Sequence, residues 1–240
     1  MKRHFTQAHQ CDRSEPVLDA LNAHGISKSE FIDLIQKPTS SLSPAERDLL
    51  SAVRDNLPAP GRDTVMQKVI PPGFFDESGA FKQSRADDYI MSPGRGDGHL
   101  TTPDKFDPEQ VGGAVTVASD TFRLSTPGDI YKGPRLDYEN SPYLPDDPGT
   151  HLIRFQLDYS STGWYEVPRN ETMGGDPMYN RWTDPFTGNG FTKSGDEIVP
   201  EYMAYNARMR EGAEMWEILD DGTQRLVAVL KGHEWIPQGN

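Results

Sequence analysis

The order of apolar and polar residues changes character near residue 57 of the chain. Before this point, apolar residues recur every three or four positions, which is the period of an amphipathic α-helix. After it, apolar and polar residues alternate in short runs bounded by glycine and proline, which is typical of half-buried β-strands. The pattern predicts a helical segment followed by a β-rich region.

Capping signals mark three helix starts between residues 14 and 57. Ser14 precedes the first apolar stripe, and Ser27 and Ser43 each stand three residues before a glutamate. A serine and a glutamate at this spacing form a capping box, in which each side chain accepts the backbone N–H of the other residue. We expect three short helices that form an N-terminal helical cap over residues 1–57.

The β-rich region begins after a proline-rich break at residues 57–61. The expected strands cover residues 64–70, 112–119, 151–157, 163–168, 199–203, 213–219 and 224–230. The segment Asp220-Asp221-Gly222-Thr223 between the last two is typical of a hairpin turn. Helices and strands do not alternate as they do in parallel sheets. The predicted fold class is α+β, with the helical unit followed by a largely antiparallel, loop-rich β domain over residues 63–240.

Alternation also assigns side chains to the two faces of two strands. Gln67 shares a face with Val65 and Val69, so it either faces a cleft or is satisfied by neighbouring backbone. Arg154 lies on the polar face of its strand, opposite the apolar Ile153. We expect Arg154 to lie in a cleft or on the surface.

Charge changes this picture by limiting the partners. The chain has 37 acidic and 24 basic residues and a net charge of −13, which repels phosphate backbones, so nucleic acid is not an expected partner.

No apolar run approaches the length of about 18 residues that a membrane span needs. The basic start Met1-Lys2-Arg3-His4 is not followed by the apolar region of a signal peptide. The expected location is cytoplasmic, or exported without an ordinary signal peptide.

Several common kinds of site are missing from the sequence. It has no P-loop, no dinucleotide-binding fingerprint and no nucleophile elbow. The single cysteine, Cys11, rules out an internal disulfide, and the six histidines have no metal-ligand spacing, so no metal is expected. What remains is Glu201, a carboxylate between hydrophobic neighbours that follows the glycine turn Gly188-Asn189-Gly190. Such a residue is either catalytic or part of an ordinary edge strand.

Three of the expected strands carry features in an order found in one group of enzymes. The features are Gln67 on the first strand, Thr116 and Ser119 on the second after a glycine pair, and Glu201 on the third, before the run Gly212–Ile218. In these residues the chain resembles the ADP-ribosyltransferase-like fold, which includes toxin domains that hydrolyse NAD. The resemblance implies that NAD is the substrate.

The resemblance also implies roles for these residues. Glu201 would be the catalytic carboxylate, which stabilises the oxocarbenium-like charge formed when the nicotinamide–ribose bond breaks. Gln67 would act with it by positioning the substrate, and Thr116 and Ser119 would bind NAD. The candidates for a cation on the pyrophosphate are Arg154, Arg135 and Lys68. The candidates for stacking on nicotinamide are Tyr131, Tyr138 and Trp182.

Two departures from the family pattern bear on the reaction. Lys68 follows Gln67 in a strand where many transferases have an arginine or a histidine. Val199 stands two residues before Glu201, where arginine-modifying members have a second carboxylate or a glutamine. Hydrolysis of NAD is therefore more compatible with the sequence than transfer of ADP-ribose to a protein. A toxin of this kind would also have an immunity protein as a partner.

Two other functions stay open at the level of sequence. The chain could be a non-catalytic interaction or structural protein, such as a phage or secretion-system component, whose acidic surface and long loops bind a protein partner. It could also be a nuclease toxin, although its negative charge and its lack of clustered histidine and lysine disfavour this.

Overall fold

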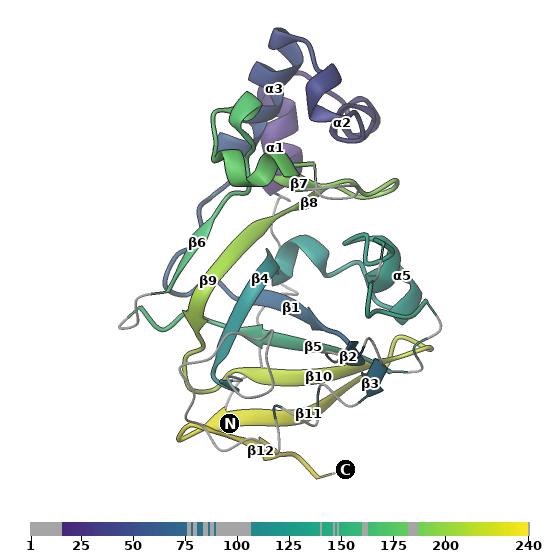
Figure 1. Cartoon of the computed structure of the whole chain (residues 1–240), viewed down its shortest axis with the longest axis vertical. Helices are drawn as coiled ribbons and strands as arrows, with labels where there is room; N and C mark the ends of the chain where they lie inside the picture. The colour runs from purple at the N-terminus through teal and green to yellow at the C-terminus, as the bar shows by residue number, and fades with distance from the viewer. Residues whose placement is uncertain are drawn as a thin grey trace.

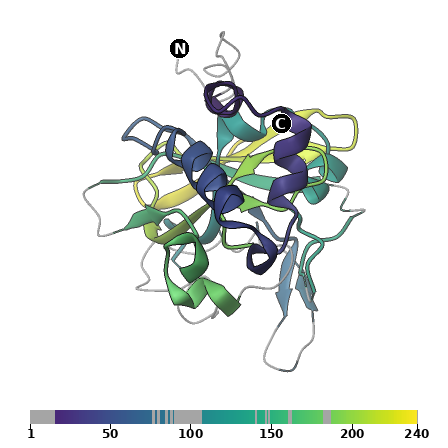
Figure 2. The ribbon, with the colours of Figure 1, turned by 90° about the horizontal axis from the view of Figure 1, so that it is seen from above.

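The structure, a computed structural model, places a helical unit above a large β-sheet (Figure 1). It describes residues 16–75, 107–139, 141–145, 149–159, 163–181 and 187–239, together with Ser78, residues 81–83, Ala86, Tyr89 and Asp147. Seen from above, the helices cover the top of the sheet (Figure 2). The predicted α+β class with an antiparallel, loop-rich β domain is confirmed.

Three helices form the N-terminal unit, as the capping signals predict. They are α1 (Pro16–Ala23), α2 (Lys28–Ile35) and α3 (Pro44–Asp55), with the 3-10 helix η1 (Thr39–Ser41) between the last two. The Ser27 hydroxyl accepts the Glu30 N–H at 3.3 Å, and the Glu30 carboxylate accepts the Ser27 N–H at 3.0 Å. Ser43 and Glu46 make the same reciprocal pair at the start of α3. Each box satisfies two N–H groups that a helix start leaves open.

Replacing Ser43 by alanine should lower the free energy of unfolding by about 1 kcal/mol, because α3 loses the acceptor at its first turn. Urea unfolding followed by circular dichroism measures the change. Ser40→Ala in η1 is the matched control, since Ser40 is exposed and its side chain has no hydrogen bond among the described residues. An S43A variant that unfolds at the wild-type urea concentration would contradict this role of the cap.

The helices do not build their core alone. Met173, Phe191 and Ile198, which lie far along the chain, complete the buried cluster between the three helices. The rings of Phe31 and Phe191 meet edge to face, with their centroids 5.2 Å apart. These partners come from a region of short elements: η4 (Glu171–Met173), η5 (Pro177–Arg181), β7 (Phe191–Thr192) and β8 (Val199–Pro200). The helical unit is therefore packed onto the β region through a shared core.

The large sheet has eight strands in the order β12-β11-β10-β5-β1-β4-β9-β6, and all neighbours are antiparallel. The strands are β1 (Met66–Ile70), β4 (Gln110–Val117), β5 (Gly149–Phe155), β6 (Trp164–Glu166), β9 (Tyr202–Arg208), β10 (Glu214–Leu219), β11 (Gln224–Lys231) and β12 (Glu234–Pro237). A separate hairpin is formed by β2 (Gly73–Phe75) and β3 (Phe81–Gln83). The predicted hairpin between β10 and β11 is confirmed, with Gly222 at a φ of 81°.

Two features of the sheet differ from what the sequence pattern predicts. The strand expected over residues 112–119 ends at Val117, and the 3-10 helix η3 (Ala118–Thr121) takes over. The strands β5 and β6 follow one another along the chain but are not neighbours, because β1 and β10 already occupy both sides of β5. The strand β6 pairs instead with β9 and becomes one edge of the sheet.

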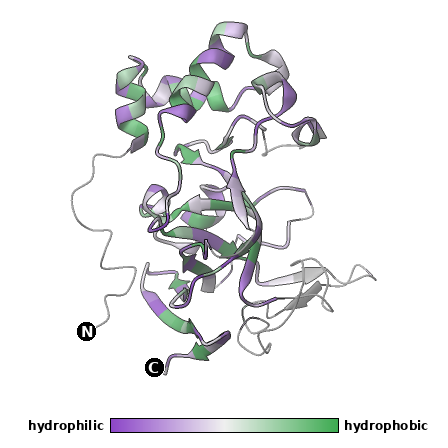
Figure 3. Ribbon diagram, turned by 90° about the vertical axis from the view of Figure 1, so that its left-hand side faces the viewer, coloured by the Kyte–Doolittle hydropathy of each residue, from purple (hydrophilic) through white to green (hydrophobic). Residues whose placement is uncertain are grey.

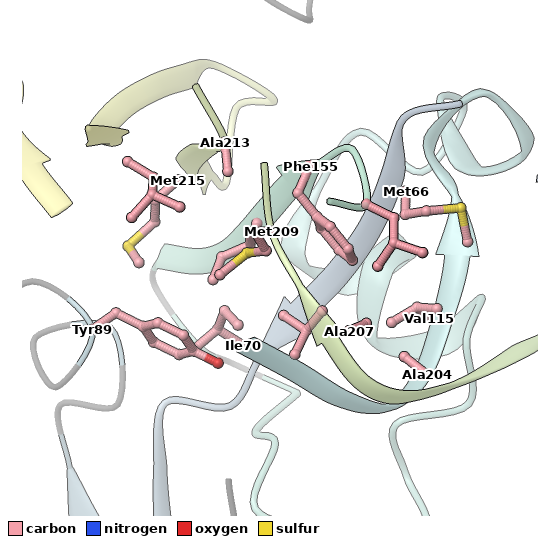
Figure 4. Close-up of a cluster of buried hydrophobic side chains, with 14 of the residues drawn as sticks. Met66, Ile70, Tyr89, Val115, Phe155, Ala204, Ala207, Met209, Ala213 and Met215 are labelled. Carbon is pink, nitrogen blue, oxygen red and sulfur yellow. The ribbon is translucent and has the colours of Figure 1, made fainter. Parts of the chain in front are cut away.

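Each face of the sheet has its own core. The main core includes Met66, Val115, Phe155 and Met215, whose side chains gather on one face (Figure 4). On the other face, the short helix α5 (Pro127–Lys132) packs Ile130 against residues of β5 and β10. Figure 3 shows hydrophilic and hydrophobic stretches interspersed along both the helices and the strands. Within the described ranges, none of the helices combines the length and the apolar character needed to cross a membrane.

Candidate functional site

A row of polar side chains crosses the sheet on the face opposite the main core. Gln67 of β1 pairs with Thr116 of β4 on one side and with Arg154 of β5 on the other, and Arg154 pairs in turn with Glu214 of β10. Directly opposed residues of antiparallel strands project to the same face of a sheet. We call Thr116, Gln67, Arg154 and Glu214 the polar row. Three of the residues predicted to contact NAD therefore lie side by side.

Hydrogen bonds fix the two middle members of the polar row. Arg154 Nε donates to Gln67 Oε1 at 3.0 Å, and Gln67 Nε2 donates to Thr121 Oγ1 at 3.0 Å. Arg154 Nη1 donates to Gln224 Oε1 at 2.9 Å. Gln67 is thus satisfied by side chains from β5 and η3, and not by the neighbouring backbone that the sequence pattern suggested.

The guanidinium of Arg154 is held in largely dry surroundings. It lies 5.6 Å from the centre of the Trp216 ring, and the Trp216 Nε1 donates to Glu214 Oε2 at 3.1 Å. Burial lowers the pKa of Arg154, and the charge of Glu214 acts in the opposite direction. Nη2 of Arg154 has no hydrogen-bond partner among the described residues. Arg154 therefore keeps a donor with which it can bind an anion.

Glu201 lies at the junction of β8 and β9, next to this row. Its neighbour Tyr202 pairs with Val115 of β4, and both of these side chains belong to the main core. Since successive strand side chains point to opposite faces, Glu201 projects to the face of the polar row. Extending the register by one residue places Glu201 opposite Thr116, and β8 contacts both β4 and η3.

The carboxyl group of Glu201 is enclosed. Its side chain is buried, with the residue 2% exposed, and Oε2 has no hydrogen-bond partner among the described residues. Burial raises the pKa of Glu201 to about 7, and the charge of Arg54 opposes the rise. A buried carboxyl group without a partner is rare in folded proteins, and a carboxyl that titrates near neutral pH is suited to proton or charge chemistry.

Arg54 of α3 holds the backbone at this point. Its Nε donates to the Gly190 carbonyl at 3.1 Å, and its Nη2 donates to the Glu201 carbonyl at 3.2 Å. The guanidinium also lies 4.5 Å from the centre of the Tyr202 ring. Arg54 is not among the residues predicted from the sequence. The signal that could have found it is its place on the buried stripe of α3, one residue after Val53.

The glycine turn before Glu201 is tightly packed. Gly188 and Gly190 have φ values of 63° and 85°, which favour glycine. A Cβ at Gly190 would lie 2.9 Å from Val167 and 3.1 Å from the Arg54 side chain. Asn189 is fully buried, and its Oδ1 accepts the Phe191 N–H at 3.0 Å. The turn therefore sets the position of Glu201, whose N–H donates to the Gly190 carbonyl at 3.0 Å.

The other predicted contacts lie away from the polar row. Ser119 is beyond the end of β4, in η3, where its hydroxyl is 3.5 Å from Asp120 Oδ1. Tyr131 is half-buried on α5, and no contact among the described residues joins it to the row. Lys68 is on the opposite face, where its Nζ donates to the Ala114 carbonyl.

The remaining candidates are accounted for separately. Arg135 donates through Nη1 to the Lys193 carbonyl at 2.9 Å and pairs through Nε with Asp137 at 2.7 Å. The rings of Tyr138 and Tyr143 meet edge to face. Trp182 and Cys11 lie outside the described residues.

Neither metal-binding clusters nor known relatives add to this site. Among the described residues, no group of three or more histidine, cysteine, aspartate or glutamate side chains is arranged to hold a metal ion. No protein-family model, curated protein or solved structure matches the chain.

Proposed function

We propose that the protein cleaves the nicotinamide–ribose bond of NAD by hydrolysis. The observation that carries the proposal is the register of the sheet, which gathers Gln67, Thr116 and Arg154 in one row beside the buried carboxyl group of Glu201. These residues come from three strands that are separated in sequence but hydrogen-bonded neighbours in the sheet. The adjacency supports the ADP-ribosyltransferase-like reading.

Each residue has a task in this reaction. As the bond from ribose C1′ to the nicotinamide nitrogen breaks, the electron pair leaves with nicotinamide and positive charge develops on the ribose. The ionised Glu201 stabilises this charge, and water adds at C1′ and loses a proton. Gln67 and Thr116 hold the ribose and amide groups in place, and Arg154 binds the pyrophosphate with its remaining donor.

The enclosure of Glu201 means that the substrate requires an opening. Residues 193–197 lie between β7 and β8 and are tied to both sides. Lys28 Nζ contacts Glu197 Oε2 at 2.8 Å, and Arg135 donates to the Lys193 carbonyl. We expect this segment to part from the α5 side when NAD enters, since few contacts hold it.

Nicotinamide release from NAD by the purified protein tests the proposal. Glu201→Gln should lower the rate by about 100-fold or more, because the charge near the ribose is lost. Glu211→Gln is the matched control, since Glu211 is an exposed carboxylate ten residues away. Arg154→Gln should mainly raise KM. A wild-type protein that releases no nicotinamide, or an E201Q variant with full turnover, would refute the proposal.

A second candidate function is non-catalytic protein binding, and one surface feature favours it. Trp164 is 53% exposed at the β6 edge and stacks on Tyr205 with ring centroids 5.3 Å apart. Met178, also largely exposed, lies within 3.9 Å of the Tyr205 hydroxyl. Exposed aromatic and methionine side chains are enriched at protein interfaces. A stable complex with a protein partner together with no nicotinamide release would select this function.

A further inference from the structure

A second feature of the molecule is a pocket of about 530 Å³ at the edge of the sheet. It lies between the end of α3, the linker that follows it, and the edge formed by β6 and β9. Tyr202 lines the pocket and belongs to the main core, whereas Glu201 projects to the other face. The pocket is thus distinct from the candidate site, and its volume falls within the range of about 300–1,000 Å³ typical of small-molecule sites.

Aromatic side chains form much of the pocket wall. Tyr159, Trp164, Tyr165 and Tyr202 all line it, together with apolar residues of the linker. Tyr159 and Tyr202 are anchored to that linker through hydroxyl contacts with the carbonyls of its prolines. Rings placed in this way offer flat surfaces to a planar ligand, with little freedom to lose on binding.

Two polar groups of the lining residues lack a hydrogen-bond partner within the part of the chain that the structure describes. The Tyr165 hydroxyl and the Arg169 Nε are buried, and neither has a hydrogen-bond partner in the described part of the chain. Burial raises the pKa of Tyr165, so this hydroxyl keeps its proton and remains a donor. A buried donor without a partner destabilises the protein by about 1–3 kcal/mol. A ligand that supplies an acceptor offsets this free energy, which favours its binding.

The charge of the lining favours an anion. The charged residues of the lining are two arginines, Arg54 and Arg169, and one carboxylate, Asp55, which lies 2.6 Å from Arg169 Nη2. The lining is therefore positive by one charge, within a chain of net charge −13. A local positive site on an acidic protein attracts a small anion and is too limited for a polyanion.

We propose that this pocket binds a small aromatic carboxylate, with its ring against Trp164 and the tyrosines and its carboxylate accepting from Tyr165 and Arg169. The inference is independent of the proposed NAD chemistry. The two sites share Arg54, which lines the pocket and also holds the Glu201 carbonyl. Neither Glu201 nor the polar row lines the pocket, so NAD does not compete with a ligand in it.

Titration of the full chain with indole-3-acetate, 1-naphthoate and benzoate, followed by ligand-observed NMR, tests the proposal. At least one of the three acids should bind. Indole-3-ethanol, which lacks the carboxylate of indole-3-acetate, should bind at least about 5-fold more weakly than that acid, because it cannot form the charge-assisted hydrogen bond. Tyr165→Phe and Arg169→Gln should each weaken binding by a similar factor. Phe122→Ala, which removes an exposed aromatic elsewhere, is the control and should bind as wild type does.

Three outcomes would overturn the inference. They are no binding of any of the three acids, equal binding of the acid and the alcohol, and unchanged binding by both the Tyr165 and Arg169 variants. Tyr165→Phe removes only an unpaired buried hydroxyl, so the variant should be at least as stable as wild type, and weaker binding by it is then not a folding defect. The acids should bind with the same affinity in the presence and in the absence of NAD, which separates this result from the outcome of the NAD assay.

Discussion

The Glu201→Gln variant is expected to be about 3 kcal/mol more stable than wild type at pH 8. Burial raises the pKa of Glu201 from 4.5 to about 7, and each pKa unit corresponds to about 1.4 kcal/mol. At pH 8, wild type must keep an ionised carboxylate in surroundings that disfavour it. A neutral amide of the same shape removes most of that cost.

The stability difference between the Glu201→Gln variant and wild type should depend on pH. Because the pKa of Glu201 is raised by folding, the folded state binds the proton more tightly than the unfolded state does. The contribution of Glu201 to stability therefore falls as pH rises from about 4.5 to about 7, and it is constant above that. Near pH 4 the protonated acid resembles glutamine, so the two proteins should then be almost equally stable.

Urea unfolding of wild type and E201Q at pH 4.5 and pH 8 measures the difference. Glu211→Gln is again the control, because an exposed carboxylate should change stability little at either pH. A stability difference between E201Q and wild type that does not change with pH would contradict the raised pKa. If E201Q both gains stability and loses NAD cleavage, Glu201 is kept for function at the expense of stability.

The Arg54→Met variant is expected to lose about 3–5 kcal/mol of stability. Arg54 makes two buried charge-assisted hydrogen bonds to the carbonyls of Gly190 and Glu201, each worth roughly 1.5–3 kcal/mol. The substitution leaves the Glu201 carbonyl without this donor and removes the cation from the Tyr202 ring. It also removes the charge that holds down the pKa of Glu201, so that pKa should rise further.

Arg54→Lys and Arg47→Met test the cause of this loss. Lysine keeps the charge but has no planar fork to reach both carbonyls, so it should recover only part of the stability. Arg47 lies on the same helix, and its side chain makes no hydrogen bond among the described residues, so R47M should lie close to wild type. Equal unfolding midpoints for R54M and R47M would show that the two carbonyl contacts do not stabilise the fold.

The sequence predicted the parts of the fold that depend on nearby residues. The capping boxes at Ser27 and Ser43 are read within four residues, and the turn at Gly222 within a hairpin. In β5, alternation correctly assigns Ile153 and Phe155 to the core, but Arg154, which was expected in a cleft or on the surface, is buried. Local rules of this kind apply without knowledge of which strands meet.

The contacts that define the candidate site are distant in sequence. Gln67 and Arg154 are 87 residues apart, and Arg54 is 147 residues from the Glu201 carbonyl that it binds. No periodicity connects such pairs, because their approach is decided by strand order and by the packing of helices onto the β region. An arginine on the buried stripe of α3 indicated a buried partner but could not identify it.

The two outermost strands bear on how the molecule behaves in a concentrated solution. At one side β6 has three residues, and at the other β12 has four and closes on Pro237, which offers no N–H for pairing. Short edge strands and a proline leave few free backbone N–H and C=O groups with which a strand of another molecule could pair. They therefore disfavour edge-to-edge aggregation. We therefore expect that this chain, although rich in β-strands, does not form fibrils by pairing of its edge strands.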